Sequence, residues 1–378
     1  MFDAGKSWWR IFGKYNFAFF YRLVQGISLN WGRKFLYIGL EDKSIYEDCY
    51  SDPILNTSLL GKTFPSPIGV AAGFDTTFKY NDELMHYGFG FEEFGTITAA
   101  PEKCPVKLHY LSSQKGIFVD ESCFNNPGVK YAQKALIDRR HFPYVAGLSI
   151  SSNVEASEEG QANQLIFERI EKELVEIVQR TAPYCDYIVL NLSHPNLPIS
   201  NLLLNGSMLE SFVVRLKEVI HKIAPISNPR LLVKVPLDIS SANIPLLCES
   251  FIASGVDGVI VGGYLNARRV NRQVVRQYFP GYVCGRPIKD ATTQLVGQFY
   301  SILQGRIPII ASGGVFTASD AFEQIKAGAS LVQIHSAIIY TGPGIANRIN
   351  SGLADLLKKN GYRCVSEAVG RKFPSRKE

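Results

Sequence analysis

Predominantly apolar, β-rich runs recur along most of the chain with helical stretches between them, and this alternation limits the possible folds more than any other feature. Strands that alternate with helices pair as parallel neighbours through right-handed crossovers. Eight such strands predict an α/β protein built on a closed (β/α)₈ TIM barrel. The predicted strands are Ile68–Ala72, Phe91–Thr96, Val145–Ile150, Tyr187–Leu190, Leu231–Val235, Val256–Val261, Ile307–Ala311 and Leu331–Ile334.

Small or polar residues stand at the ends of several predicted strands, where the active site of a barrel forms. They are Ala72-Gly73, Gly95-Thr96, Ser149, Lys234, Gly262-Gly263, Gly313-Gly314 and His335-Ser336. Barrels commonly bind phosphate after their seventh and eighth strands, through backbone N–H groups and a helix N-terminus. One glycine pair alone indicates only a tight turn, but two adjacent strand ends of this kind favour a phosphorylated ligand.

The fourth predicted strand runs into the loop Asn191-Leu-Ser-His194-Pro-Asn196. Because Pro195 stops both helix and strand, the loop presents two amides, a hydroxyl and an imidazole at the end of a buried strand. This pattern predicts polar chemistry at the carboxyl rim of the barrel.

Residues 1–45 predict a helical extension, separate from a barrel that spans 46–378. Trp8, Phe12, Tyr15 and Phe19 recur at helical spacing, which places their rings on one face. Within residues 1–40 six Lys and Arg side chains oppose Asp3 alone, which accounts for +5 of the net charge of +6. Such a segment either caps the barrel or binds an anionic membrane surface. No uncharged run in it is long enough to cross a bilayer.

Charge and cysteine patterns exclude several other classes of protein. The basic residues are interleaved with bulky aromatic side chains, so no nucleic-acid partner is expected. The seven cysteines are scattered and include no C-x-x-C pair. We therefore expect neither a disulfide framework nor a bound metal, and a reducing compartment fits best.

Several segments together resemble one known family, the class 2 dihydroorotate dehydrogenases, which are quinone-dependent and membrane-associated. The segments are Gly69-Val-Ala-Ala-Gly-Phe-Asp75, Gly88-Phe-Gly-Phe91, Asn191-Leu-Ser-His-Pro-Asn196, Gly285-Arg-Pro287, Gly305-Arg-Ile-Pro-Ile-Ile310 and Ala327-Gly-Ala-Ser-Leu-Val-Gln333. The resemblance implies a barrel that holds FMN and oxidises dihydroorotate to orotate in pyrimidine biosynthesis. It also implies electron transfer to quinone beneath two N-terminal helices, and so peripheral attachment of residues 1–45 to the cytoplasmic face of a membrane.

The same resemblance assigns an FMN site that is largely intact. It implies that Ala71, Ala72 and Gly73 lie beside the flavin ring, with Thr96 near its edge and a fixed cation, Lys234, near the ring. Ser149 replaces an asparagine that is usual in the family. The remaining residues assigned to the cofactor, mostly around its phosphate, are Asn191, Gly262, Gly285, Gly313, Gly314, His335 and Ser336.

The residues that the resemblance assigns to substrate depart further from the family pattern. Asn125, Asn191 and Asn196 are retained, but Thr76 stands where the family has a lysine. An asparagine after the sixth strand is replaced within Gly262-Gly263-Tyr264. Asp120 stands for another asparagine, and Tyr110 for an arginine of the quinone tunnel. We expect Arg268, Arg269, Arg272 or Arg276 either to supply the missing cation or to form a solvated basic loop.

His194 stands where the family has its catalytic serine. An imidazole has a pKa near neutrality, about 6.5, and takes a proton directly, whereas a serine must pass it to a relay. His194 is therefore the predicted catalytic residue, with a surface loop histidine as the alternative. Cys123 and Cys284 rank below it as candidate bases.

The resemblance thus implies an FMN-dependent oxidoreductase, with dihydroorotate as the default substrate and quinone as acceptor. Two alternatives stay open. One is a divergent FMN enzyme that acts on another cyclic amide or enone, which Thr76 and Gly263 favour. The other is a catalytically silent flavin-binding or scaffold protein.

Overall fold

The computed structural model describes residues 49–103, 108–112, 116–120, 124–139, 144–154, 163–193, 203–204, 207–266 and 281–372. The predicted helical extension, residues 1–45, lies outside these ranges. Among the helices that the structure describes, none is both long and apolar enough to cross a membrane.

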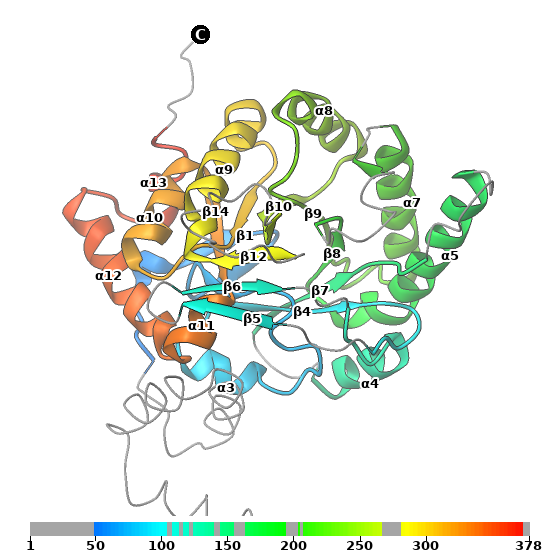
Figure 1. Cartoon of the computed structure of the whole chain (residues 1–378), viewed down its shortest axis with the longest axis horizontal. Helices are drawn as coiled ribbons and strands as arrows, with labels where there is room; N and C mark the ends of the chain where they lie inside the picture. The colour runs from blue at the N-terminus through cyan, green and yellow to red at the C-terminus, as the bar shows by residue number, and fades with distance from the viewer. Residues whose placement is uncertain are drawn as a thin grey trace, which may run out of the picture.

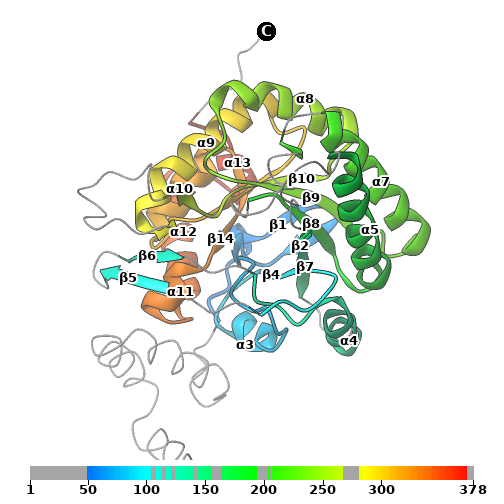
Figure 2. The same ribbon diagram turned by 45° about the vertical axis from the view of Figure 1, so that its right-hand side comes forward.

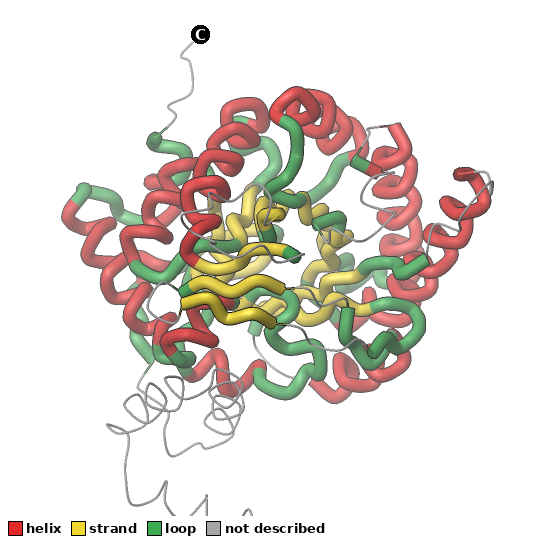
Figure 3. The backbone as a smooth tube through the Cα atoms, in the orientation of Figure 1, coloured by secondary structure: helices red, strands yellow, loops and turns green. Residues whose placement is uncertain are grey.

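Eight parallel strands close into a barrel at the centre of the molecule, surrounded by helices (Figure 3). Around the ring they follow in chain order, and the last pairs with the first. The strands are β3 (Ile68–Val70), β4 (Phe91–Ile97), β7 (Val145–Ile150), β8 (Tyr187–Asn191), β9 (Arg230–Val235), β10 (Gly258–Gly262), β13 (Ile309–Ser312) and β14 (Ala329–Ile334). All eight predicted strands and the barrel itself are confirmed.

Two strands begin two residues later than predicted, for local reasons. Pro308 has no N–H to donate to a ladder, so β13 begins after it. Before β10, Gly255 ends a helix with φ +65°, and the Val256 N–H donates back to Phe251 O in that helix. Apolar character alone therefore placed the start of both strands two residues too early.

A ring of helices covers the outer face of the barrel (Figure 1). The main ones are α3 (Asn81–His86), α4 (Val129–Arg139), α5 (Asn163–Thr181), α7 (Ser207–Ile223), α8 (Ile244–Ser254), α9 (Lys289–Leu303), α10 (Ala318–Ala327), α11 (Ser336–Thr341), α12 (Ile345–Lys359) and α13 (Val365–Ala368). Short 3₁₀ helices lie at Pro53–Leu55, Ala182–Tyr184, Ser241–Asn243 and Arg286–Ile288. Helix α10 shows how sequence sets a boundary, since Thr317 and Asp320 cap its first turn reciprocally.

The interior of the barrel is filled by large rings set against glycines. A Cβ on Gly69 would lie 2.4 Å from the Phe91 ring, and one on Gly147 would lie 2.1 Å from the Tyr187 ring. Both rings are buried, and Phe91 also meets Phe64 edge to face at a centroid distance of 5.4 Å. Small residues on one strand thus create the space that an aromatic ring on the next strand fills.

Two smaller sheets were not predicted. The hairpin of β1 (Thr57–Leu59) and β2 (Lys62–Phe64) brings Phe64 into the amino end of the barrel. A four-stranded antiparallel sheet is built from β5 (Leu108–Ser112), β6 (Ile117–Asp120), β11 (Leu265–Asn266) and β12 (Tyr282–Gly285). Its strands are inserted after β4 and β10, so they lie over the carboxyl rim, and Figures 1 and 2 show β5 and β6 beside α11.

Candidate functional site

A cavity opens at the carboxyl rim, where the sequence placed polar strand ends. It is lined by Ala71, Ala72, Lys234, Gly263, Tyr264, Cys284, Ile288, Ser312, Gly313, Gly314, Val315, Phe316, Gln333, Ile334, His335, Ser336 and Ala337. Five barrel strands, β3, β9, β10, β13 and β14, therefore contribute to one space. Seven of the predicted cofactor residues lie in its wall: Ala71, Ala72, Lys234, Gly313, Gly314, His335 and Ser336.

The glycines after β13 have backbones that only glycine adopts easily. Gly313 has φ +120° and Gly314 has φ +82°. A Cβ on Gly314 would lie 2.3 Å from the Lys289 Cα at the start of α9. Close packing of this loop against α9 thus requires glycine, and it also leaves the cavity wall free of side chains at that point.

The other glycines predicted for the cofactor, Gly73, Gly262 and Gly285, are not among the residues that line the cavity. A Cβ on Gly73 would lie 3.7 Å from His335 Cε1, so the ends of β3 and β14 are in contact. A Cβ on Gly262 would lie 2.0 Å from the Ser312 carbonyl oxygen, and one on Gly285 would lie 1.9 Å from the Gly116 carbonyl oxygen. These two positions are explained by close backbone approach.

Thr96, Ser149 and Asn191 form one hydrogen-bonded group next to the cavity. The Asn191 amide donates to Thr96 Oγ1 at 2.8 Å, and Thr96 Oγ1 lies 2.9 Å from Ser149 Oγ. Asn191 Oδ1 accepts from both the backbone N–H and the hydroxyl of Ser193, at 3.0 and 2.7 Å. Neighbouring strands β4, β7 and β8 are therefore tied together where the loop that leads to His194 begins.

Lys234 belongs to a buried polar cluster inside the barrel. Its Nζ lies 3.6 Å from Glu93 Oε1, with 5% and 0% of the two side chains exposed. Gln333 Nε2 donates to Glu93 Oε2 at 2.6 Å. Burial, and then the negative charge of Glu93, raise the pKa of the nearby Tyr187 phenol well above its usual value. The cluster thus holds a cation in the cavity wall with its counter-ion behind it.

The loop after β3 is organised by one buried carboxylate. Asp75 accepts from the backbone N–H groups of Thr77, Lys79 and Tyr80 at 2.6–2.9 Å, and from the Thr77 hydroxyl. Thr76, half-buried, lies within this turn. The loop geometry is therefore fixed by Asp75, whichever residue follows it.

Of the other residues predicted to bind or act on substrate, the structure describes only some. Asn125 is exposed. His194 and Asn196 lie outside the described residues, as do the four arginines of the loop after β10 and Cys123. Ser193, the residue before His194, lies beside the cavity, because a Cβ on Gly263 would be 3.6 Å from Ser193 Oγ and 3.8 Å from Lys234 Cε.

Cys284 and Tyr264 share the side of the cavity that the inserted sheet covers. Burial, and then the charge of Asp120, raise the pKa values of both the thiol and the phenol well above their usual ranges. Both groups are therefore protonated at neutral pH. A raised thiol pKa disfavours Cys284 as a base relative to His194.

The comparisons with known proteins agree with this geometry. A model of the dihydroorotate dehydrogenase family matches residues 54–357. The chain belongs to the dihydroorotate dehydrogenase family.

Relatives of the quinone type cover most of the chain. A dihydroorotate dehydrogenase (quinone) of Xanthobacter autotrophicus is 33% identical over 324 residues, covering 84% of this chain and 88% of the relative. One from Sphingopyxis alaskensis is 34% identical over 326 residues, covering 85% and 86%. The crystal structure of Eimeria tenella DHODH in complex with ferulenol superposes with a TM-score of 0.80 at 26% identity, covering 91% and 95%. The resemblance predicted from the motifs is confirmed.

The residues present fit FMN, the cofactor of the dihydroorotate dehydrogenase family. Gln333, which lines the cavity, has a buried Oε1 without a hydrogen-bond partner among the described residues. Lys234 offers a buried cation beside it, and the glycines after β13 leave backbone exposed to a ligand. Such a set suits a flat, polar cofactor with a phosphate at one end.

Sequence reasoning missed Gln333, which lines the cavity, and Glu93, which lies behind Lys234. Both are polar residues in otherwise apolar barrel strands, and that interruption was the available signal. Strands that are buried on both faces are recognised from their overall apolar content, so single polar residues within them do not stand out.

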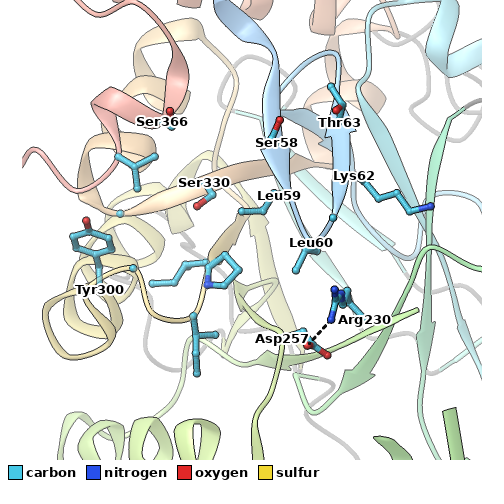
Figure 4. Close-up of a pocket in the computed structure, with 17 residues that line it drawn as sticks. Ser58, Leu59, Leu60, Lys62, Thr63, Arg230, Asp257, Tyr300, Ser330 and Ser366 are labelled. Atoms are coloured by element: carbon cyan, nitrogen blue, oxygen red, sulfur yellow. Dashed lines mark ion pairs between the residues drawn. The ribbon is translucent and has the colours of Figure 1, made fainter. Parts of the chain in front are cut away.

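A wider cavity lies at the opposite end of the barrel, among Ser58, Lys62, Arg230, Asp257 and Ser330 (Figure 4). Its charged side chains are paired: Arg230 Nη1 lies 3.6 Å from Asp257 Oδ1, and Lys62 Nζ lies 2.6 Å from Asp186 Oδ1. Because the amino end of a barrel serves stability, we assign the functional site to the carboxyl rim.

Proposed function

We propose that this protein is an FMN-dependent dihydroorotate dehydrogenase that oxidises dihydroorotate to orotate and passes the electrons to quinone. The observation that carries the proposal is the buried Lys234 ammonium in a cavity that the glycine loop after β13 also lines. A fixed cation and exposed backbone in one cavity match a flavin ring and its phosphate.

In this proposal the side chains of the rim divide the work of binding and proton transfer. FMN supplies the hydride acceptor. Lys234 stabilises negative charge at the ring, and Gly313, Gly314 and Ser336 receive the phosphate. The group of Thr96, Ser149 and Asn191 fixes the edge of the site, and Asn125 and Asn196 are the proposed amide contacts to substrate, with Thr76 beside them.

His194 is the proposed base that takes the substrate proton. Its chain neighbour Ser193 is held by Asn191 and, like Lys234, lies within 4 Å of where a Cβ on Gly263 would stand. We expect His194→Ala to retain FMN and to slow flavin reduction by substrate by 10²-fold or more, since positioned acid–base groups contribute about 10²–10⁴-fold. An unchanged rate of reduction in rapid-mixing experiments would exclude His194 from the mechanism.

Quinone is proposed as acceptor because the relatives described above carry that designation. Residues 1–45 supply the matching sequence pattern, an aromatic face rimmed by Lys and Arg. We therefore propose peripheral association with the cytoplasmic face of a membrane. Co-sedimentation with anionic vesicles, compared between the full chain and a chain lacking residues 1–45, tests this.

Anaerobic addition of dihydroorotate to the purified protein tests the proposed reaction. The proposal expects the flavin absorbance to bleach rapidly, with orotate formed in equal amount. Bleaching only by another dihydro-heterocycle would replace the substrate and keep the enzyme class. No bleaching by any such compound, with FMN bound, would indicate the silent flavin-binding protein.

One observation favours the second candidate, an FMN enzyme for another cyclic amide or enone. Tyr264 lines the cavity next to Gly263, where the family has an asparagine, and its ring meets Tyr282 at a centroid distance of 6.3 Å. This wall is more aromatic and offers no amide.

If Arg268 or Arg269 supplies the cation that is missing at Thr76, Arg268→Ala or Arg269→Ala will weaken substrate affinity. Unchanged affinity in both variants would exclude that role.

A further inference from the structure

Glu93 is a fully buried carboxylate that the proposed reaction does not use. It lies on β4, and the cavity wall includes Lys234 of β9 and Gln333 of β14 but not Glu93 itself. Lys234 therefore stands between Glu93 and the cavity. The electrostatic potential at a ligand that contacts the ammonium group therefore also depends on the carboxylate behind it.

For a fully buried carboxylate, Glu93 has few hydrogen-bond donors and cations around it among the described residues. In the part of the chain that the structure describes, it accepts one hydrogen bond, from Gln333 Nε2 at 2.6 Å, and its Oε1 has only the ion pair with Lys234 at 3.6 Å. The phenol of Tyr187 on β8 also lies near enough for the charge of Glu93 to raise its pKa. Burying a carboxylate with so few partners costs stability, and a pair of apolar residues would serve the core at least as well.

We propose that Glu93 is a positioning residue that holds the Lys234 ammonium in the cavity wall and offsets part of its charge, so that the pair sets the reduction potential of the bound FMN. The inference rests on the proposed function in one respect, that this cavity holds FMN. It assigns Glu93 a role that is electrostatic and acts through Lys234.

The sign of the effect follows from the charges. Reduction makes the flavin more negative, so a nearby cation favours the reduced form and a nearby anion favours the oxidised form. In a water-excluded interior the two contributions remain large at distances of several ångströms. Removing the charge of Glu93 while Lys234 stays therefore raises the potential, and removing Lys234 lowers it.

The strand itself provides a matched control. Glu92 is the adjacent residue of β4, and it too is fully buried. Successive side chains of a strand point to opposite faces, and Glu92 Oε2 accepts from Asn81 of α3 at 2.9 Å, on the outside of the barrel. Glu92→Gln thus removes an equally buried carboxylate from the same strand, but not from the cluster around Lys234.

The test is the midpoint potential of the FMN-loaded protein, measured by equilibration with redox dyes, for wild type, Glu93→Gln, Glu93→Asp and Glu92→Gln. Glu93→Gln is expected to favour reduced over oxidised FMN at least tenfold more than wild type does, a rise of about 30 mV for a two-electron couple. Glu93→Asp keeps the charge and is expected to return most of the way to the wild-type potential. Glu92→Gln is expected to leave the potential unchanged.

A potential of Glu93→Gln equal to that of wild type, or an equal rise in Glu92→Gln, would overturn the inference and leave Glu93 a structural residue. If Glu93→Gln does not fold, the same change is made in a Lys234→Met background, where a neutral pair replaces the ion pair. The double variant, which lacks both charges and leaves no unpaired carboxylate, is then expected to have a lower potential than wild type, because the cation lies nearer the cavity than the anion does; a potential equal to that of wild type contradicts the inference. Failure of the wild-type protein to bind FMN would instead refute the proposed function.

Discussion

At the scale of single residues, the site depends on side chains that have few alternatives. The Asn191 amide nitrogen donates to Thr96 Oγ1 and its amide oxygen accepts from the Ser193 hydroxyl, so both polar atoms of the side chain are hydrogen-bonded. Aspartate, which has the same size and shape, has no N–H to donate to Thr96 when it is ionised. The group therefore fixes both the end of β8 and the start of the loop that carries His194.

Replacing Asn191 is expected to cost stability as well as activity. Asn191→Ala leaves the buried Thr96 and Ser193 hydroxyls with one partner fewer each, which costs about 1–3 kcal/mol in the free energy of unfolding. Urea denaturation followed by circular dichroism measures it. Ser151→Ala is the control, since it removes one hydrogen bond to the Asn191 carbonyl oxygen, at 3.2 Å, and is expected to cost about 1 kcal/mol. Equal costs would contradict this account of Asn191.

Residues differ in how well the sequence predicted them. Lys234, Gly313, Gly314 and His335 were predicted because each follows or ends a strand, and strand ends share one rim. Glu93 was not, because its role depends on which side chains meet across the barrel interior. No local sequence pattern indicates which side chains from strands far apart in the chain meet each other.

At the scale of elements, loops that pack tightly against helices position the site. The loop after β13 lies on the first turn of α9, and only the absence of a Cβ at Gly314 permits this approach. The eight strands were predictable from their apolar content. The antiparallel sheet over the rim was not, because its strands are short and its central pairing, of β6 with β12, joins segments more than a hundred residues apart.

Gly314→Ala is expected to weaken both folding and cofactor binding. Its Cβ would meet the Lys289 backbone at 2.3 Å, so the loop must move, at a cost of about 2–4 kcal/mol in unfolding free energy. The control is Gly305→Ala, which has a similar φ of +78° but nothing within 4 Å of the added Cβ. It is expected to cost only the backbone strain, about 1 kcal/mol. Thermal unfolding and FMN titration of both variants measure this, and equal losses would contradict the packing argument.

An ion pair joins the start of the described chain to α12. Asp52 caps the 3₁₀ helix Pro53–Leu55 through the Ile54 N–H, and Lys358 Nζ lies 2.6 Å from its Oδ2. The hydrogen bond from Lys358, then that from Ile54, hold the pKa of the Asp52 carboxyl below its ordinary value. A lowered folded-state pKa stabilises the fold above the unfolded-state pKa, about 3.9, and that stabilisation is lost as the pH falls through the folded-state pKa.

Asp52→Asn is therefore expected to lower the melting temperature slightly at pH 7, by about 1 °C. The amide oxygen still caps the helix, so the loss reports the charge. The gap from wild type is expected to stay constant down to about pH 4 and to close as the pH falls further. Asp290→Asn, at a carboxylate that is 93% exposed, is expected to change nothing. A gap that persists at pH 2 would contradict the assignment to charge.

At the scale of the whole molecule, the barrel separates stability from function. The amino end is closed by a hairpin and by ion pairs between exposed or half-exposed side chains, while the carboxyl end gathers glycines, a buried cation and the loop that leads to His194. This division was predictable from the alternation of strands and helices. The family was predicted from motifs at the rim. The substrate was not, because Thr76 and Gly263 replace residues that the family uses to bind it, so its identity requires experiment.

The most direct test of the account is whether the carboxyl rim binds FMN. The purified protein is expected to be yellow, with flavin absorbance corresponding to about one FMN per chain, and the protein stripped of flavin is expected to rebind FMN. Lys234→Met is expected to rebind it more weakly. A colourless protein that does not bind added FMN, while circular dichroism shows it folded, would contradict the central claim.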